Sequence, residues 1–248
     1  MRLDFKGRTV LITGASRGIG ARLADDFAKC GAKLVLTAAS ADGLASLTTY
    51  VKQHKLSAIC FRLDLADEAS TEVFLKELTR FKIDILVNNA GVNEIDWIED
   101  TSLKTWDDML RVNLKGPFML TRALAPGMKK NGYGRIINIA SIFGIITREK
   151  RSIYSTTKAG LLGLTRTSAI ELARHNVLVN AVSPGFVATE LTRRILTQRD
   201  IAGLTKQIPS GRMALPKDIS PVVLFLASEH NSYIVGQNII VDGGYVNI

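Results

Sequence analysis

Seven short apolar runs, separated by helical patterns, constrain the fold of this chain more than any other feature. The runs lie at residues 9–13, 33–38, 58–62, 83–87, 134–140, 177–182 and 238–241. Helical patterns fill most of the intervals, at residues 21–30, 42–54, 66–81, 105–130, 155–174 and 217–227. Continuous apolar strands that alternate with helices indicate a parallel sheet that is buried on both faces.

Right-handed crossovers between such strands give a doubly wound sheet. We therefore predict a Rossmann-like α/β fold in which helices cover both faces of a seven-stranded parallel sheet. The chain of 248 residues has no internal linker, so a single domain over residues 1–248 is expected. The interval 185–215 lacks a strand and is rich in polar residues. We expect a helical lid over the substrate there, at about 186–215.

A glycine-rich turn follows the first apolar run. Thr13 is followed by Gly14, Gly18 and Gly20 in a G-x-x-x-G-x-G pattern, and a helical pattern begins at once. Glycines between a strand and a helix let backbone N–H groups approach a pyrophosphate at the positive end of the helix dipole. A lone motif of this kind can be only a tight turn, but here it stands in the first crossover of a repeated pattern. The sequence therefore predicts a dinucleotide site.

Tyr154 and Lys158 are candidates for proton transfer. In a helix their spacing places the phenol and the ammonium on one face, one turn apart. A cation held there favours the phenolate and lowers the tyrosine pKa, so that the phenol can exchange a proton near neutral pH. Ser141 closes the run at 134–140, and its hydroxyl can lie beside the phenol. Most isolated Tyr-x-x-x-Lys pairs are solvated helix faces, so this interpretation depends on the dinucleotide site.

Taken in order along the chain, these motifs resemble those of the short-chain dehydrogenase/reductase family. The resemblance runs from Gly7 to Gly244 and is carried by Thr13-Gly14-x-x-x-Gly18-Ile19-Gly20, Asn88-Asn-Ala-Gly91, Asn113, Ser141, Tyr154-x-x-x-Lys158 and Pro184-Gly185-x-x-x-Thr189. Within the family, the stretches 31–35, 208–212 and 236–244 look most like 3-oxoacyl-[acyl-carrier-protein] reductases.

The resemblance implies a carbonyl reductase or alcohol dehydrogenase that moves a hydride between a nicotinamide and a substrate carbon. Tyr154 would give a proton to the carbonyl oxygen, and Ser141 would hydrogen-bond that oxygen. Lys158 would lower the tyrosine pKa and bind the nicotinamide ribose. Asn113 would perturb its helix and anchor a water that links Lys158 to solvent, although Pro117 could kink the same helix without any role for Asn113.

The resemblance also implies the cofactor-binding residues. They are Gly14, Ser16, Arg17, Gly18, Ile19, Gly20, Ser40, Asp64, Leu65, Asn89, Ala90, Gly91, Tyr154, Lys158, Pro184, Gly185, Val187 and Thr189. Asp64 would bind the adenine amino group, or it would only cap the helix after Leu65. Asn88 would brace the central sheet. Pro184-Gly185 would begin the segment that holds the nicotinamide carboxamide, unless it is an ordinary turn.

The choice of cofactor depends on the end of the second strand. An acidic residue there would bond the ribose 2′-hydroxyl of NAD and repel the 2′-phosphate of NADP. This chain has Thr37-Ala-Ala-Ser40 at that point, and no acid occurs before Asp42. Arg17 in the glycine-rich turn can pair with the phosphate. NADP is therefore favoured, and NAD is not excluded, because Ala39 stands about where many NADP-using relatives carry an arginine.

Composition narrows the function classes. The net charge is +9, but the basic residues form no single stripe with interleaved aromatic residues, so no nucleic-acid partner is expected. Two segments, 148–151 and 186–212, hold five of the excess charges and flank the substrate mouth in this family. They form either an electrostatic funnel for an anionic substrate or an incidental part of a solubilising surface. The two cysteines and three histidines show no metal-binding spacing, so no metal site is expected.

We expect a cytoplasmic enzyme, because the sequence shows no signal peptide and no apolar run long enough to span a membrane. The first substrate choice is a 3-oxoacyl thioester, with acyl carrier protein as a possible partner. Against that partner, the two basic positions that such reductases use to grip it fall at Gly132 and His175, although Lys129, Lys130 and Arg174 are adjacent. A sugar, polyol or other small ketone is the alternative substrate. A non-catalytic NADP-sensing or nucleic-acid-binding module is the alternative of another class, and the resemblance implies a homotetramer.

Overall fold

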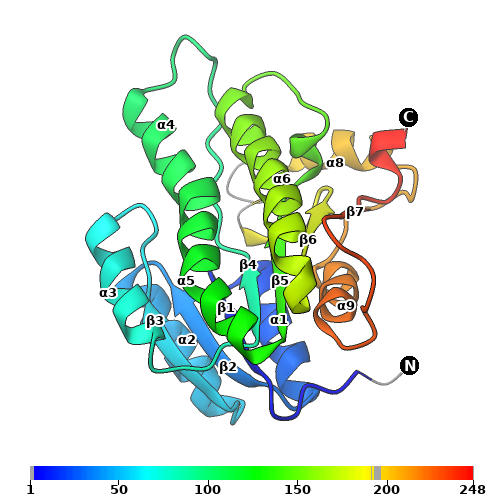
Figure 1. Ribbon diagram of the computed structural model, residues 1–248. Helices are drawn as coiled ribbons and strands as arrows, with labels where there is room; N and C mark the ends of the chain where they lie inside the picture. The colour runs from blue at the N-terminus through cyan, green and yellow to red at the C-terminus, as the bar shows by residue number, and fades with distance from the viewer. Residues whose placement is uncertain (1–2, 191, 193–196, 248) are drawn as a thin grey trace.

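The computed structural model describes residues 3–190, 192 and 197–247, in which seven strands form one parallel sheet (Figure 1). The strands are β1 Thr9–Ile12, β2 Lys33–Ala38, β3 Ala58–Arg62, β4 Ile85–Asn88, β5 Gly134–Ile139, β6 Val177–Pro184 and β7 Asn238–Val241. The α-helices are α1 Gly18–Lys29, α2 Ala41–Gln53, α3 Glu68–Leu78, α4 Leu103–Leu110, α5 Gly116–Asn131, α6 Ser152–Leu172, α8 Gln198–Gln207 and α9 Pro216–Ala227. Short helical turns are η1 Arg111–Lys115, η2 Ile142–Gly144, η3 Ala173–His175 and η4 Tyr245–Asn247.

The strand order is β3-β2-β1-β4-β5-β6-β7. β1 pairs in parallel with β2 on one side and with β4 on the other, so the direction of winding reverses between β1 and β4. Ligands bind doubly wound sheets at the carboxyl ends of the strands beside such a switch point. The predicted Rossmann-like sheet is confirmed, and its topology fixes where a site can form.

Two apolar cores, one on each face, stabilise the sheet. Side chains of β1 alternate between them: Val10 and Ile12 pack with α1, α2 and α9, whereas Leu11 packs with α3, α5 and α6. In Figure 1, α5 and α6 lie in front of the sheet and α1 and α9 behind it. Strands buried on both faces need apolar side chains at every position, which is why the predicted runs are continuous.

The helix predicted over 105–130 is divided in the structure. α4 leads into the π-helical turn η1, and α5 follows without a break. Pro117 has no N–H group, so the carbonyl of Asn113 lacks the i+4 donor that an α-helix supplies. The backbone widens at that point. Each of the other predicted elements matches the structure or differs at its ends by one to three residues.

The segment where a lid was expected contains helix α8. Thr197 caps this helix, because its hydroxyl accepts the Asp200 N–H while the Asp200 carboxylate accepts the Thr197 N–H. Val187 forms an isolated bridge with Ala214, which ties the two ends of the segment together. A helical element is therefore present, and its closure over a substrate stays a prediction.

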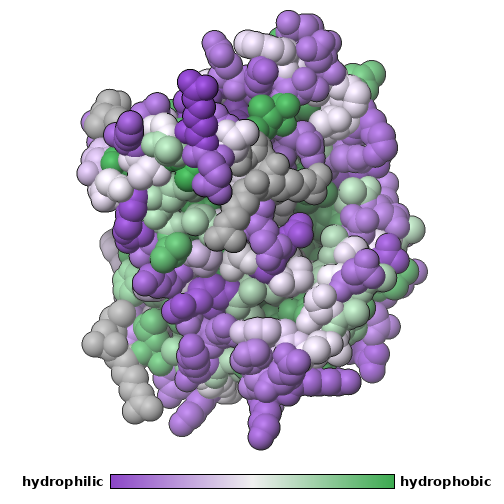
Figure 2. Space-filling view, turned by 180° about the vertical axis from the view of Figure 1, so that it is seen from behind, coloured by the Kyte–Doolittle hydropathy of each residue, from purple (hydrophilic) through white to green (hydrophobic). Residues whose placement is uncertain are grey.

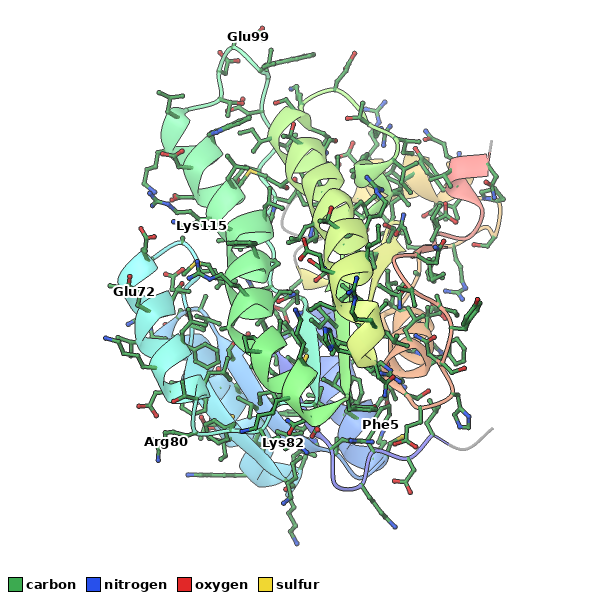
Figure 3. The ribbon with its side chains drawn as sticks, in the orientation of Figure 1. Phe5, Glu72, Arg80, Lys82, Glu99 and Lys115 are labelled. Atoms are coloured by element: carbon green, nitrogen blue, oxygen red, sulfur yellow. The ribbon has the colours of Figure 1, made fainter. Side chains whose placement is uncertain are left out.

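Charged residues, among them Glu99 and Lys82, lie at opposite ends of the molecule. Figure 3 shows Glu99, before α4, at the opposite end from Lys82, which precedes β4. Lys115 ends η1 and donates a 2.6 Å hydrogen bond to Glu68, which joins η1 to the start of α3. Seen from behind, apolar and polar residues are interspersed over much of the surface (Figure 2). No helix within the described ranges is long and apolar enough to cross a membrane.

Candidate active site

The turn between β1 and α1 requires glycine. Gly14 and Gly18 have φ of +65° and +60°, which a residue with a Cβ adopts only at a cost. At Gly20 a Cβ would lie 2.3 Å from the Gly14 carbonyl oxygen and 2.5 Å from Asn89 Nδ2. The backbone of this turn is consequently open to a ligand on one side and closely packed on the other.

The segment after β4 forms the second wall of the site. Asn89 Nδ2 donates to the Thr13 carbonyl at 2.8 Å, and the Ala90 N–H donates to Thr13 Oγ1 at 2.9 Å. A Cβ on Gly14 would lie 3.0 Å from Ala90 Cα, so these segments touch backbone to backbone. Asn88 Nδ2 donates to Asn138 Oδ1 at 2.8 Å and braces β4 against β5, as predicted.

A cavity of about 720 Å³ lies at this end of the sheet. Its volume falls in the range of small-molecule and cofactor sites, roughly 300–1,000 Å³. Most predicted site residues line it: Gly14, Ser16, Arg17, Gly18, Ile19, Asp64, Leu65, Asn89, Ala90, Gly91, Ser141, Tyr154, Lys158, Pro184, Gly185, Val187 and Thr189. Gly20, Ser40 and Asn113 are absent from its lining, and each has a supporting contact instead. The Ser40 hydroxyl caps α2 by accepting the Gly43 N–H at 3.0 Å.

Ser141, Tyr154 and Lys158 converge in this cavity, as the spacing predicted. Ser141 follows β5 and is hydrogen-bonded with the Tyr154 phenol. Tyr154 lies in the first turn of α6, and Lys158 follows one turn later. Lys158 is only 4% exposed, and its Nζ donates to the carbonyl of Ile139 at 2.9 Å. The phenol and the hydroxyl can therefore act on one substrate oxygen, and the ammonium lies 5.6 Å from the centre of the tyrosine ring.

Burial governs the acidity of these groups. It raises the pKa of Tyr154 above its usual value, and the Ser141 hydrogen bond and the nearby Arg151 charge oppose that rise. Burial also lowers the pKa of Lys158 to about 8. We expected Lys158 to lower the tyrosine pKa. The structure differs, because the cost of burying the phenolate exceeds the opposing effects, and those effects come from Ser141 and Arg151.

Asn113 lies outside the cavity lining and stabilises two segments of the site through hydrogen bonds. It is fully buried in η1, and its side chain exchanges hydrogen bonds with Val92, accepting from the N–H and donating to the carbonyl at 2.9 Å each. It also donates to Thr157 Oγ1 at 3.1 Å. A Cβ on Gly91 would lie 3.3 Å from Asn113 Oδ1 and 3.6 Å from Lys158 Nζ. Asn113 thus fixes the loop after β4 against the helix that carries Lys158.

The predicted cofactor residues fit a dinucleotide. Arg17 borders the glycine turn, and a weak, exposed ion pair of 3.8 Å with Glu190 leaves its guanidinium able to reach an anion. Thr189 approaches the same turn, where a Cβ on Gly18 would lie 3.4 Å from Thr189 Cγ2. Asp67, and not Asp64, caps α3, so the alternative role of Asp64 as a helix cap is wrong.

Several residues that line the cavity were not predicted as site residues, and Asn93, Phe143 and Arg151 are among them. Arg151 was counted in a basic segment at the substrate mouth, but it is buried. Of the other basic residues in the proposed funnel, Arg212 is paired with Asp218 at 2.6 Å. Arg193 and Arg194 lie outside the described residues. In the part of the chain that the structure describes, no group of three or more His, Cys, Asp or Glu could hold a metal ion.

Comparisons with known proteins agree with this geometry. Residues 14–246 match the family model described as "Enoyl-(Acyl carrier protein) reductase". The chain is 38% identical to the 3-oxoacyl-[acyl-carrier-protein] reductase FabG of Aquifex aeolicus over 98% of this chain and 99% of that protein. It is 36% identical to FabG of Escherichia coli over 98% of both chains.

Solved structures of dehydrogenases also match this chain closely in fold. A putative NAD(P)-dependent gluconate 5-dehydrogenase from Beutenbergia cavernae, with bound NADP at low occupancy, superposes with a TM-score of 0.95 at 35% identity over the whole of both chains. A gluconate 5-dehydrogenase from Burkholderia cenocepacia, in complex with NADP and tartrate, gives 0.92 at 32% identity, over 100% of this chain and 98% of that one. The motifs, the sheet and these matches agree, and the chain belongs to the short-chain dehydrogenase/reductase family.

Proposed function

We propose that this chain is an NADP-dependent enzyme that interconverts a ketone and a secondary alcohol. The convergence of Ser141, Tyr154 and Lys158 in a cavity whose wall includes the glycine turn carries this proposal. Bound NADPH would supply the hydride for the carbonyl carbon. The turn from Gly14 to Gly20 would hold the pyrophosphate, and Arg17 would pair with the 2′-phosphate.

Side chains of the protein would supply the proton that the carbonyl oxygen takes up when the carbonyl carbon receives the hydride. Because burial raises the pKa of Tyr154, the phenol keeps its proton at neutral pH and can donate it to the carbonyl oxygen. Ser141 would hydrogen-bond that oxygen as charge develops on it. Lys158, whose pKa is about 8, remains mostly charged at neutral pH and would bind the nicotinamide ribose. Asn113 would keep the loop and α6 in register for these contacts, and a water relay through it is part of the proposal.

A 3-oxoacyl thioester is the first substrate candidate, because the two relatives described above are 3-oxoacyl-[acyl-carrier-protein] reductases. Docking of acyl carrier protein on a single chain has less support. Lys129 and Lys130 lie in the last turn of α5, and Arg174 follows α6. Both helices end shortly before the next strand begins, so these residues lie near the amino ends of the strands, whereas the cavity lies at the carboxyl ends. A homotetramer and a cytoplasmic location are part of the same proposal.

A small polar ketone such as a sugar acid is the second candidate. Both solved structures described above are named as gluconate 5-dehydrogenases, and gluconate is a carboxylate. One feature of the cavity, the buried guanidinium of Arg151, favours this class. A non-catalytic NADP-sensing or nucleic-acid-binding role has less support, because such a role gives no reason for the phenol, hydroxyl and ammonium to converge.

The test is NADPH oxidation by the purified protein with acetoacetyl-CoA, keto sugar acids such as 5-ketogluconate, and neutral ketoses. We expect Tyr154→Phe to lower kcat by about 10²–10⁴-fold, the usual contribution of a general acid. NADPH binding, followed by fluorescence titration, should be largely retained in this variant. Turnover near the wild-type rate in Tyr154→Phe would exclude the proposed proton donor.

A further inference from the structure

Arg151 is a buried cation in the catalytic cavity. It immediately precedes α6, three residues before Tyr154, and is 9% exposed. It lines the same cavity as Ser141, Tyr154 and Lys158. Neither the glycine turn nor the residues that would hold the dinucleotide explain its presence there. Its neighbour in the loop, Arg148, is by contrast exposed to solvent.

The guanidinium has fewer partners than a buried charge needs. Its Nη1 donates to Asn93 Oδ1 at 3.1 Å, and its Cζ lies 5.5 Å from the centre of the Phe143 ring. A guanidinium carries five N–H donors. Within residues 3–190, 192 and 197–247, no carboxylate forms an ion pair with it. A cation that lines a cavity and has no carboxylate partner in the chain can pair with an anion that enters the cavity, so the arrangement points to an anion supplied from outside the chain.

The guanidinium lies close to the reacting groups. The Phe143 ring contacts both Arg151 and Tyr154, and its centre lies 6.2 Å from that of the tyrosine ring. The Arg151 charge also opposes the rise in the pKa of Tyr154 that burial causes. Arg151 and the two groups that would bind the carbonyl oxygen therefore line one cavity, and Phe143 lies next to both Arg151 and Tyr154.

We propose that Arg151, with Asn93, forms a subsite for a carboxylate of the substrate, so that the ketone reduced here is an oxo acid. Arginine binds a carboxylate through two parallel hydrogen bonds. The Asn93 side chain, whose oxygen already accepts from Arg151, has an amide NH₂ left to donate. This inference rests on the proposed carbonyl reduction, but of the two substrate classes it favours the small oxo acid over the thioester.

Two matched pairs of probes test the subsite. Acetoacetate is compared with methyl acetoacetate, and 5-ketogluconate with L-sorbose, which has a hydroxymethyl group in place of the carboxylate. Binding of each probe to the enzyme–NADP⁺ complex is measured by titration calorimetry, because a ketone cannot react with the oxidised cofactor. Steady-state kcat/KM with NADPH is measured in parallel. We expect wild-type enzyme to prefer the acid in at least one pair, in both measurements.

Variants separate recognition from a structural role. Arg151→Met should lower kcat/KM for the preferred acid roughly 10–100-fold, mainly through KM, since a hydrogen-bonded charge is lost. The neutral member of the pair should change less than about threefold, and Arg151→Lys should recover part of the preference for the acid. Arg148→Met removes an exposed charge from the same loop and should leave the preference within about twofold of wild type.

Equal losses for the acid and its neutral partner would make Arg151 a structural residue and overturn the inference. Absence of any carboxylate preference in wild-type binding, in both pairs, would overturn it as well. Failure of the proposed function has a different signature, since no carbonyl compound would then be reduced although NADPH binds. The calorimetric comparison still decides the subsite in that case.

Discussion

Substitution of Gly20 by alanine should damage both the fold and the dinucleotide site. The added Cβ would lie 2.3 Å from the Gly14 carbonyl oxygen, about 1 Å short of the 3.4 Å at which ordinary contact begins. Because the neighbour is backbone, the turn itself must move. Overpacking of this kind costs about 1–3 kcal/mol, and we expect the upper part of that range. For a chain of this size, about 3 kcal/mol lowers Tm by roughly 6–12 °C.

The assay is thermal unfolding of Gly20→Ala with and without saturating NADPH. A bound ligand raises Tm by an amount that grows with the logarithm of its concentration divided by its Kd, so a displaced turn that weakens NADPH binding should also reduce the increase caused by NADPH. Gly203→Ala is the matched control. Gly203 lies in α8, where an added Cβ would meet no atom within 4 Å, and alanine there should stabilise the helix by up to about 1 kcal/mol. A Gly20→Ala protein with wild-type Tm and a wild-type response to NADPH would refute the reasoning.

Three further outcomes follow from the structure. The native state releases the Lys158 proton at about pH 8, whereas the unfolded chain keeps it up to about pH 10.5. Between these two pH values the free energy of unfolding of the wild type should therefore rise by up to about 3 kcal/mol relative to that of Lys158→Met. Denaturant titrations measure both proteins, and parallel pH profiles would contradict this expectation. Asn113→Ala removes three hydrogen bonds of the buried Asn113 side chain to Val92 and Thr157. Urea unfolding should show that the free energy of unfolding falls by about 2–4 kcal/mol. A decrease below about 0.5 kcal/mol would show that these hydrogen bonds contribute little to stability. Lys150 has a φ of +61°, so Lys150→Gly should raise Tm slightly, and a lower Tm would indicate that its side chain is needed.

The sequence was most informative where one residue type has one geometric use. Continuous apolar strands predicted the sheet, and Gly14, Gly18 and Gly20 predicted the turn because only glycine fits there. The i, i+4 spacing of Tyr154 and Lys158 predicted their shared face. The direction of the tyrosine pKa could not be predicted in this way, because it depends on how much solvent the surrounding elements exclude, and spacing along one helix does not report that.

Arg151 shows why the remaining part of the site was not predictable. In the sequence it belongs to a charged run with Arg148 and Lys150, and such runs usually lie in solvent. The structure separates them: Lys150 adopts the left-handed conformation, and the next residue is buried in the cavity. A left-handed residue other than glycine and a buried cation without a carboxylate each destabilise a fold. Two such features at consecutive positions, three and four residues before Tyr154, lead to a hypothesis of function. For Arg151 that hypothesis is the carboxylate subsite proposed above, because its guanidinium lines the same cavity as Ser141 and Tyr154.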